Sequence, residues 1–199
     1  MPCRGPVGPE RLRSQSIRAR YTAGTIGSRT VPSYVDEPGV DASRNTETYA
    51  SLTVEVDSRR WTGVPFTLRS GKALPEDGGE IAIFFRSLPQ FLVDRWPGVE
   101  PNVLRIGLQD PYVRLAIAMT GSDLATQMHK MELRAAPPQR SPYANLVVEM
   151  LRSNPMLTIR GDEAEEAWRI VDPVLAAWSA GEVPMQEYPA GTQPPDTPA

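Results

Sequence analysis

Residues 46–74 read TETYASLTVEVDSRRWTGVPFTLRSGKAL, and the fold prediction depends most on this stretch. Apolar side chains alternate in its first half, and those on one face are Ala50, Leu52, Val54 and Val56. A period of two predicts a half-buried strand, with Tyr49 and Ser51 on the opposite, exposed face. After a turn, the alternation resumes at Val64, Phe66 and Leu68. Because Pro65 removes a donor from the ladder, this second strand should lie at a sheet edge or carry a bulge.

Four further strands follow through short turns. They are expected at residues 81–85, 103–108, 113–119 and 127–133. The strand at 81–85 is predicted to be more buried than the first two, and the strand at 103–108 should have Leu104, Ile106 and Leu108 pointing inward. Strands that follow one another without intervening helices favour an antiparallel sheet.

Two helices are expected after the strands. Ser141 and Pro142 suit the N-cap and first position of an amphipathic helix. A second helix should begin near Asp162, with an apolar stripe of Ala164, Trp168, Val171, Leu175 and Trp178. Pro173 should kink or divide it. The fold class predicted is therefore α+β, a large, mostly antiparallel sheet with C-terminal helices packed on it and no Rossmann domain.

Composition excludes several function classes. The formal net charge of −3 over 199 residues argues against a nucleic-acid partner. The single cysteine, Cys3, permits no internal disulfide. Neither a signal peptide nor an apolar run long enough to span a membrane is visible, so a cytoplasmic location without a membrane partner is expected.

The termini look irregular. Residues 1–20 are rich in proline and arginine and show no sustained hydrophobic periodicity. They are therefore expected to form a disordered lead-in. The alternatives are a transit peptide and an arm that binds a polyanion. The expected organisation is this lead-in, a domain over residues 21–180, and a proline-rich tail over 181–199.

A candidate anion site lies at the end of the second strand. Arg69 and Lys72 would reach a loop, where binding residues are common. The alternative is that both cations are solvated or pair with Glu76 or Asp77. The loop is not a P-loop, because the glycine required five positions before Gly71 is absent.

Other candidate sites are weaker. His129 has no acid beside it in the sequence to orient it, so a structural role is expected. The acids near residue 162 look like a helix start rather than a metal site, so no metal is expected.

Several stretches occur together in an informative order. They are YTAGTIG at 21–27, VPSYVDEPGV at 31–40, TETYA at 46–50, RWTGVPFTLRSGKAL at 60–74, NVLRIGLQD at 102–110, PYANL at 142–146, DEAEEAWRIVDPVL at 162–175 and YPAGT at 188–192. This series, which covers most of the chain, resembles the second half of the NADP-dependent glucose-6-phosphate dehydrogenases.

The resemblance implies a large antiparallel sheet that also forms a dimer interface. It implies that Lys72 binds glucose 6-phosphate, with Arg69 as a possible second contact. A basic residue usually follows Lys72 by five positions; here that residue is Asp77, which would repel a phosphate.

The resemblance also implies that the Rossmann domain, the NADP site and the catalytic histidine belong to an upstream half. His129 does not match the catalytic position. The chain is therefore expected to be a substrate-binding and dimerisation portion, inactive alone and binding no cofactor by itself. The alternatives are a non-catalytic module that pairs with a full-length dehydrogenase, and a degenerate remnant.

Overall fold

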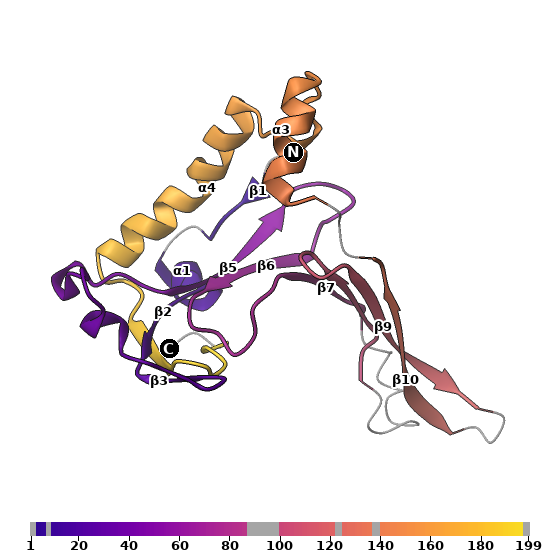
Figure 1. Cartoon of the computed structure of the whole chain (residues 1–199), viewed down its shortest axis with the longest axis horizontal. Coiled ribbons are helices and arrows are strands. Elements are labelled where there is room, and N and C mark those ends of the chain that lie inside the picture. Colours follow the sequence, from indigo (N-terminus) through magenta and orange to yellow (C-terminus); the bar gives the residue numbers. More distant parts are fainter. Residues whose placement is uncertain (1–2, 7–8, 87–99, 122–124, 137–139, 197–199) are drawn as a thin grey trace. The chain divides into compact units, whose positions relative to one another are not determined.

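The structure, a computed structural model, describes residues 3–6, 9–86, 100–121, 125–136 and 140–196. The chain divides into two units (Figure 1). The first contains residues 1–76 and 155–199, and the second contains residues 77–154. Both combine antiparallel strands with helices, so the predicted α+β class is confirmed, with the strands distributed over separate sheets.

The first unit is built on a five-stranded sheet. Its strands are β1 (Cys3–Arg4), β2 (Ser16–Thr22), β5 (Tyr49–Val56), β6 (Pro65–Gly71) and β11 (Met185–Pro189). The order is β1-β5-β2-β11, and β6 pairs with β5. In the described part of the chain β6 has no other partner, so Pro65 lies on an edge strand, where its missing donor leaves no ladder bond unmade.

Shorter elements complete this unit. They are α1 (Pro9–Gln15), β3 (Gly24–Ile26), β4 (Arg29–Val31), the 3-10 turns η1 (Tyr34–Asp36), η2 (Ala42–Arg44) and η3 (Pro155–Leu157), and the long helix α4 (Gly161–Ser179). Pro173 lies inside α4, which continues through it as one element instead of dividing.

Two buried clusters cover opposite faces of the central strands. The first contains Ile17, Ala19, Tyr21, Val31, Tyr49, Tyr188 and Ala190. The second contains Leu12, Val174, Ala177, Trp178 and Val183, with Ala50 and Leu52 packed against it. The prediction that residues 49–56 form a strand with one exposed face is therefore wrong for the first residues of the strand. Tyr49 and Ser51 lie on the face expected to be exposed, and both are buried.

The helix α4 contacts this core through a narrower face than its sequence suggests. Val174, Ala177 and Trp178 are buried, whereas Trp168 is 60% exposed. Positions i, i+3 and i+4 still define the buried face, but only the last turns of the helix reach the sheet cluster.

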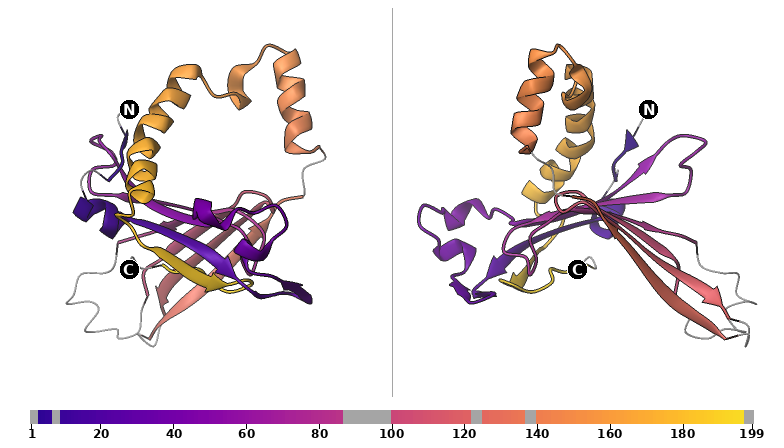
Figure 2. Two further views of the ribbon diagram at one scale, coloured as in Figure 1. Left: turned by 90° about the vertical axis from the view of Figure 1, so that its left-hand side faces the viewer. Right: turned by 45° about the vertical axis from the view of Figure 1, so that its right-hand side comes forward.

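The termini correct the expectation of disordered ends. Residues 9–22 form α1 and β2, with Leu12, Ile17 and Ala19 buried. Near the other end, β11 lies parallel to β2, in yellow beside indigo in Figure 2. Tyr188 within it is 1% exposed. In Ser16–Thr22 the apolar Ile17, Ala19 and Tyr21 alternate with two arginines, a strand period that the arginine-rich composition of residues 1–20 outweighed in the prediction. Met185–Pro189 is shorter and becomes ordered by pairing with this strand.

The second unit is an antiparallel meander. Its strands β7 (Glu80–Phe84), β8 (Val103–Gly107), β9 (Tyr112–Thr120) and β10 (Thr126–Arg134) lie in the order β10-β9-β8-β7, and the long β9–β10 pair is visible in Figure 1. Helix α3 (Pro142–Leu151) follows, and the Ser141 hydroxyl accepts a hydrogen bond from the Ala144 N–H, as an N-cap should.

Two burial predictions for this unit are wrong. Residues 81–85 were expected to be buried, but Ile81 is 49% exposed and Phe84 is 66% exposed. Leu108, expected to point inward, is 61% exposed. The residues of β7 are as apolar as expected and pair with β8. In the described part of the chain, however, too little packs on β7 to bury its side chains.

Candidate functional site

Lys72 directly follows β6 and is exposed at the sheet edge. Within the described residues its ammonium group forms no ion pair, and neither does the guanidinium of Arg69. Pairing with Glu76, which the sequence left open, is therefore not seen. A cation without an internal partner is available to an external anion.

The main chain around Lys72 is held on both sides. Its N–H donates to the Thr48 carbonyl at 2.9 Å, and its carbonyl accepts from the Tyr188 hydroxyl at 2.6 Å. The next carbonyl, that of Ala73, accepts from the Gly191 N–H at 2.8 Å. Ala73 has a φ of 51°, a conformation unfavourable for a residue with a Cβ, so the neighbouring contacts must compensate for it.

Gly71 permits a close approach at the start of the loop. A Cβ added there would lie 2.8 Å from Cδ2 of Tyr49, its register partner on β5. Tyr49 is buried, so this contact could not be relieved by moving the ring into solvent. A glycine before Lys72 therefore lets the end of β6 lie against the tyrosine cluster.

Arg69 is less favourably placed to share a ligand with Lys72. It lies within β6 opposite Ser51 and is exposed. A separation of three positions along an extended chain turns two side chains to opposite faces of the sheet. The strand geometry therefore favours Lys72 as a single anion contact. Asp77 is the first residue of the second unit and is exposed.

A tyrosine cluster lies beneath the loop. The rings of Tyr49 and Tyr188 meet edge to face at 6.1 Å, and those of Tyr21 and Tyr188 meet at 6.5 Å. Burial raises the pKa of the Tyr188 hydroxyl, so the group remains a donor at neutral pH. Burial, together with the hydrogen bond to Glu37, raises the pKa of Tyr21 to about 12.

The remaining candidates do not form a catalytic site. His129 lies on β10 opposite Ile117, with no ion pair or side-chain hydrogen bond in the described part of the chain. Across the same described ranges, no cluster of histidine, cysteine or acidic side chains could hold a metal.

The described residues contain no strand–helix–strand unit of the Rossmann type. Their single parallel pair is β2–β11, whose strands are joined by most of the chain rather than by one crossover helix. None of the described helices is long and apolar enough to cross a membrane.

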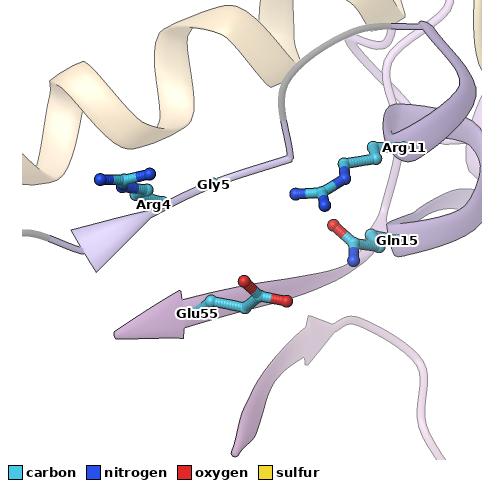
Figure 3. Close-up of a pocket in the computed structure, with 5 residues that line it drawn as sticks. All are labelled: Arg4, Gly5, Arg11, Gln15 and Glu55. Atoms are coloured by element: carbon cyan, nitrogen blue, oxygen red, sulfur yellow. The ribbon is translucent and has the colours of Figure 1, made fainter. Parts of the chain in front are cut away.

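A separate hollow of about 320 Å³ lies in the first unit (Figure 3). Arg4, Gly5, Arg11, Gln15 and Glu55 line it. Arg4 is already paired with Asp57 at 2.6 Å, and Glu55 contributes a negative charge. With Asp57 counted beside its partner Arg4, the two arginines are balanced by two acids, so the hollow has no formal excess of positive charge to attract a phosphate group.

Comparison with known proteins identifies the family. Residues 3–198 match the model described as "Glucose-6-phosphate dehydrogenase, C-terminal domain". The chain belongs to the glucose-6-phosphate dehydrogenase family. The match includes both terminal segments, so the C-terminal domain of this family extends beyond the expected limits of 21 and 180.

Individual glucose-6-phosphate dehydrogenases agree with this assignment. The enzyme of Treponema pallidum is 35% identical over 206 residues, which include 97% of this chain and 39% of the relative. That of Mycolicibacterium smegmatis is 33% identical, with 96% and 40% covered. The chain thus spans about two fifths of the length of the curated relatives it matches.

Solved structures of the family agree as well. A glucose-6-phosphate 1-dehydrogenase from Mycobacterium avium superimposes with a TM-score of 0.75 at 30% identity, covering 98% of this chain and 39% of its own. A second structure, described as a glucose-6-phosphate dehydrogenase in complex with its substrate glucose-6-phosphate, gives a TM-score of 0.72 at 25% identity. It covers 96% of this chain and 44% of its own.

Sequence reasoning named Lys72 as a candidate substrate contact but did not indicate the groups that hold its main chain. Tyr188 is 116 residues from Lys72 along the chain and lies in a segment expected to be an irregular tail. No local spacing relates the two. The only signal in the sequence is the YPAGT stretch, which contributes to the family resemblance without indicating a contact.

Proposed function

We propose that this chain is the substrate-binding and dimerisation portion of a glucose-6-phosphate 1-dehydrogenase. The complete enzyme would transfer a hydride from C1 of glucose 6-phosphate to NADP. In this proposal Lys72 binds the phosphate group, whereas hydride transfer and NADP binding need residues outside this chain. The observation that carries the proposal is the family match over residues 3–198, which includes an exposed Lys72 without an internal ion pair.

Binding of glucose 6-phosphate to the purified chain tests the proposed role of Lys72. Isothermal titration calorimetry should detect binding, and Lys72→Ala should weaken it by about tenfold or more, since a charge-assisted hydrogen bond contributes about 1.5–3 kcal/mol. Lys130→Ala is the matched control, because Lys130 is an exposed lysine on β10. If wild type and Lys72→Ala bind equally, or if neither binds, the proposed substrate contact is wrong.

Asp77 offers a second arm of the same titration. Because an acid near a bound phosphate would repel the phosphate, Asp77→Asn should strengthen binding of glucose 6-phosphate.

Incubating the chain with glucose 6-phosphate and NADP should produce no NADPH. Formation of NADPH by the purified chain would contradict the proposal that it is inactive alone.

Self-association is the second function proposed, and the β7–β10 apolar face supports it. We define this face by its exposed members Ile81, Ile83, Val113, Met119, Met131 and Leu133. The register places them together, since Ile81 is opposite Ile106, Ile106 opposite Val113, and Val113 opposite Leu133. Large apolar patches of this kind usually mark protein–protein contacts. A second copy of the chain, or a full-length relative, is the proposed partner.

Analytical ultracentrifugation tests the proposed association. Leu133→Glu places a charge on the β7–β10 apolar face and should shift the chain toward monomer. Lys130→Glu introduces the same residue on the opposite face of the same strand and should leave the association unchanged. A monomeric wild-type chain that also fails to bind a full-length dehydrogenase would exclude this role.

A further inference from the structure

The hydroxyl of Tyr188 meets the main chain of Lys72 from the interior. Tyr188 is 1% exposed, and its hydroxyl donates to the Lys72 carbonyl at 2.6 Å. The same hydroxyl lies 3.3 Å from the hydroxyl of Thr48. Thr48 in turn accepts the Lys72 N–H through its carbonyl and the Tyr21 N–H through its hydroxyl. Both peptide groups of Lys72 are thus joined to one partly buried network.

We propose that Tyr188 is a positioning residue for substrate binding, which fixes the main chain at Lys72 so that its ammonium group is presented to the phosphate of the sugar. The inference rests on the proposed function, in which Lys72 binds glucose 6-phosphate. Tyr188 itself is buried and does not touch the ligand.

The geometry explains why such a residue is needed. Lys72 lies beyond the last paired residue of an edge strand, where a chain has fewer ladder bonds to hold it. Its neighbour Ala73 has a positive φ, which the loop would leave if its hydrogen bonds were lost. A lysine side chain already loses rotamer freedom on binding, so a backbone ordered in advance avoids a second entropic cost.

Tyr188 is also held in a way that suits the role. Its ring is fixed edge to face by Tyr49 and Tyr21. Strand β11 pairs with β2 along its whole length, from Met185 opposite Arg18 to Pro189 opposite Thr22. The donor is therefore attached to the central sheet, and the two residues after β11 extend the support, since the Gly191 N–H donates to Ala73.

A matched pair of variants separates positioning from packing. Tyr188→Phe removes only the hydroxyl and keeps the ring. Tyr49→Phe makes the same change in the same cluster, at a tyrosine whose hydroxyl forms no hydrogen bond within the described residues. Tyr188→Phe should weaken binding of glucose 6-phosphate by about three- to tenfold, because the main chain at Lys72 would then be ordered only when the ligand binds. Tyr49→Phe should leave the affinity unchanged.

The titration is accompanied by thermal unfolding of each variant and by amide hydrogen exchange. Tyr188→Phe should accelerate exchange at the Lys72 amide, while its Tm should lie only about 1–6 °C below that of Tyr49→Phe, the effect of one internal hydrogen bond. Equal affinity for wild type and Tyr188→Phe would overturn the positioning role but leave Lys72 as a substrate contact. Equal losses in the two tyrosine variants would also overturn it, because packing would then explain both.

A measurement on the wild-type chain applies even if Tyr188→Phe does not fold. The Lys72 amide should already be protected from exchange in the free protein and should change little when glucose 6-phosphate is added. An amide that is unprotected until the ligand binds would overturn the inference, because the ligand and not Tyr188 would then order the loop. If the wild-type chain binds no glucose 6-phosphate, the proposed function fails instead, and the inference fails with it.

Discussion

Arg18 should be one of the most stabilising side chains of this protein, although its segment has the composition of a disordered arm. Its side chain is 6% exposed on β2. Nη1 donates to the Trp178 carbonyl at 2.5 Å, and Nη2 donates to the Asn45 carbonyl at 2.8 Å. Glu47 lies 3.6 Å from Nη2. One guanidinium therefore joins the sheet to the end of α4 and to the loop before β5.

The expected cost of Arg18→Ala follows from these contacts. Two charge-assisted hydrogen bonds contribute about 1.5–3 kcal/mol each. Their loss is partly offset because a buried charge is removed, including an Nε atom that has no partner in the described part of the chain. The net destabilisation should be about 3 kcal/mol, which corresponds to a Tm lower by about 6–12 °C for a chain of this size. Arg18→Lys keeps the charge but not the planar fork, so it should lose about half as much.

Urea unfolding followed by circular dichroism measures these differences. Arg29→Ala is the control, since Arg29 is exposed on β4 and forms no ion pair in the described ranges. It should change the free energy of unfolding by less than about 0.5 kcal/mol. If Arg18→Ala is as mild as Arg29→Ala, the buried position of Arg18 and the ordering of residues 9–22 would both be refuted.

Two other changes test the core beside the Lys72 loop. Gly191→Ala should destabilise by about 2–4 kcal/mol in urea unfolding, because its φ is 81° and a Cβ would lie 1.9 Å from the Thr25 carbonyl oxygen. Gly27→Ala is the control, because Gly27 has a φ of 59° but open space around the added Cβ, and it should cost only about 1 kcal/mol. If the two variants lose equal stability, the clash between the added Cβ at Gly191 and the Thr25 carbonyl is refuted. Between pH 10 and 12 stability should fall, because Tyr21 keeps its proton to a pKa of about 12 when folded but to about 10 when unfolded. Tyr21→Phe should make the free energy of unfolding fall less steeply between pH 10 and 12. If the fall is as steep as in the wild type, groups other than Tyr21 cause it.

Much of the secondary structure could be predicted because it depends on local chemistry. The alternation at residues 50–56, the proline at 65 and the serine–proline pair at 141–142 each act within a few residues, and the strand, edge position and N-cap follow as expected. Burial could not be predicted in the same way. Ile81 and Ile83 are as apolar as core residues, but whether a sheet face is covered depends on what packs against it.

Taken by itself, the amino-acid sequence determined the α+β class, the order of most strands and helices, the family, and Lys72 as the candidate substrate contact. The tertiary structure alone decided how the chain ends are used and what holds Lys72. Met185–Pro189 is too short to signal a strand by itself, and it becomes ordered because it pairs with Ser16–Thr22 from the other end of the chain. The contact between Tyr188 and Lys72 has the same origin: a hydrogen bond between residues 116 positions apart leaves no periodic trace in the sequence.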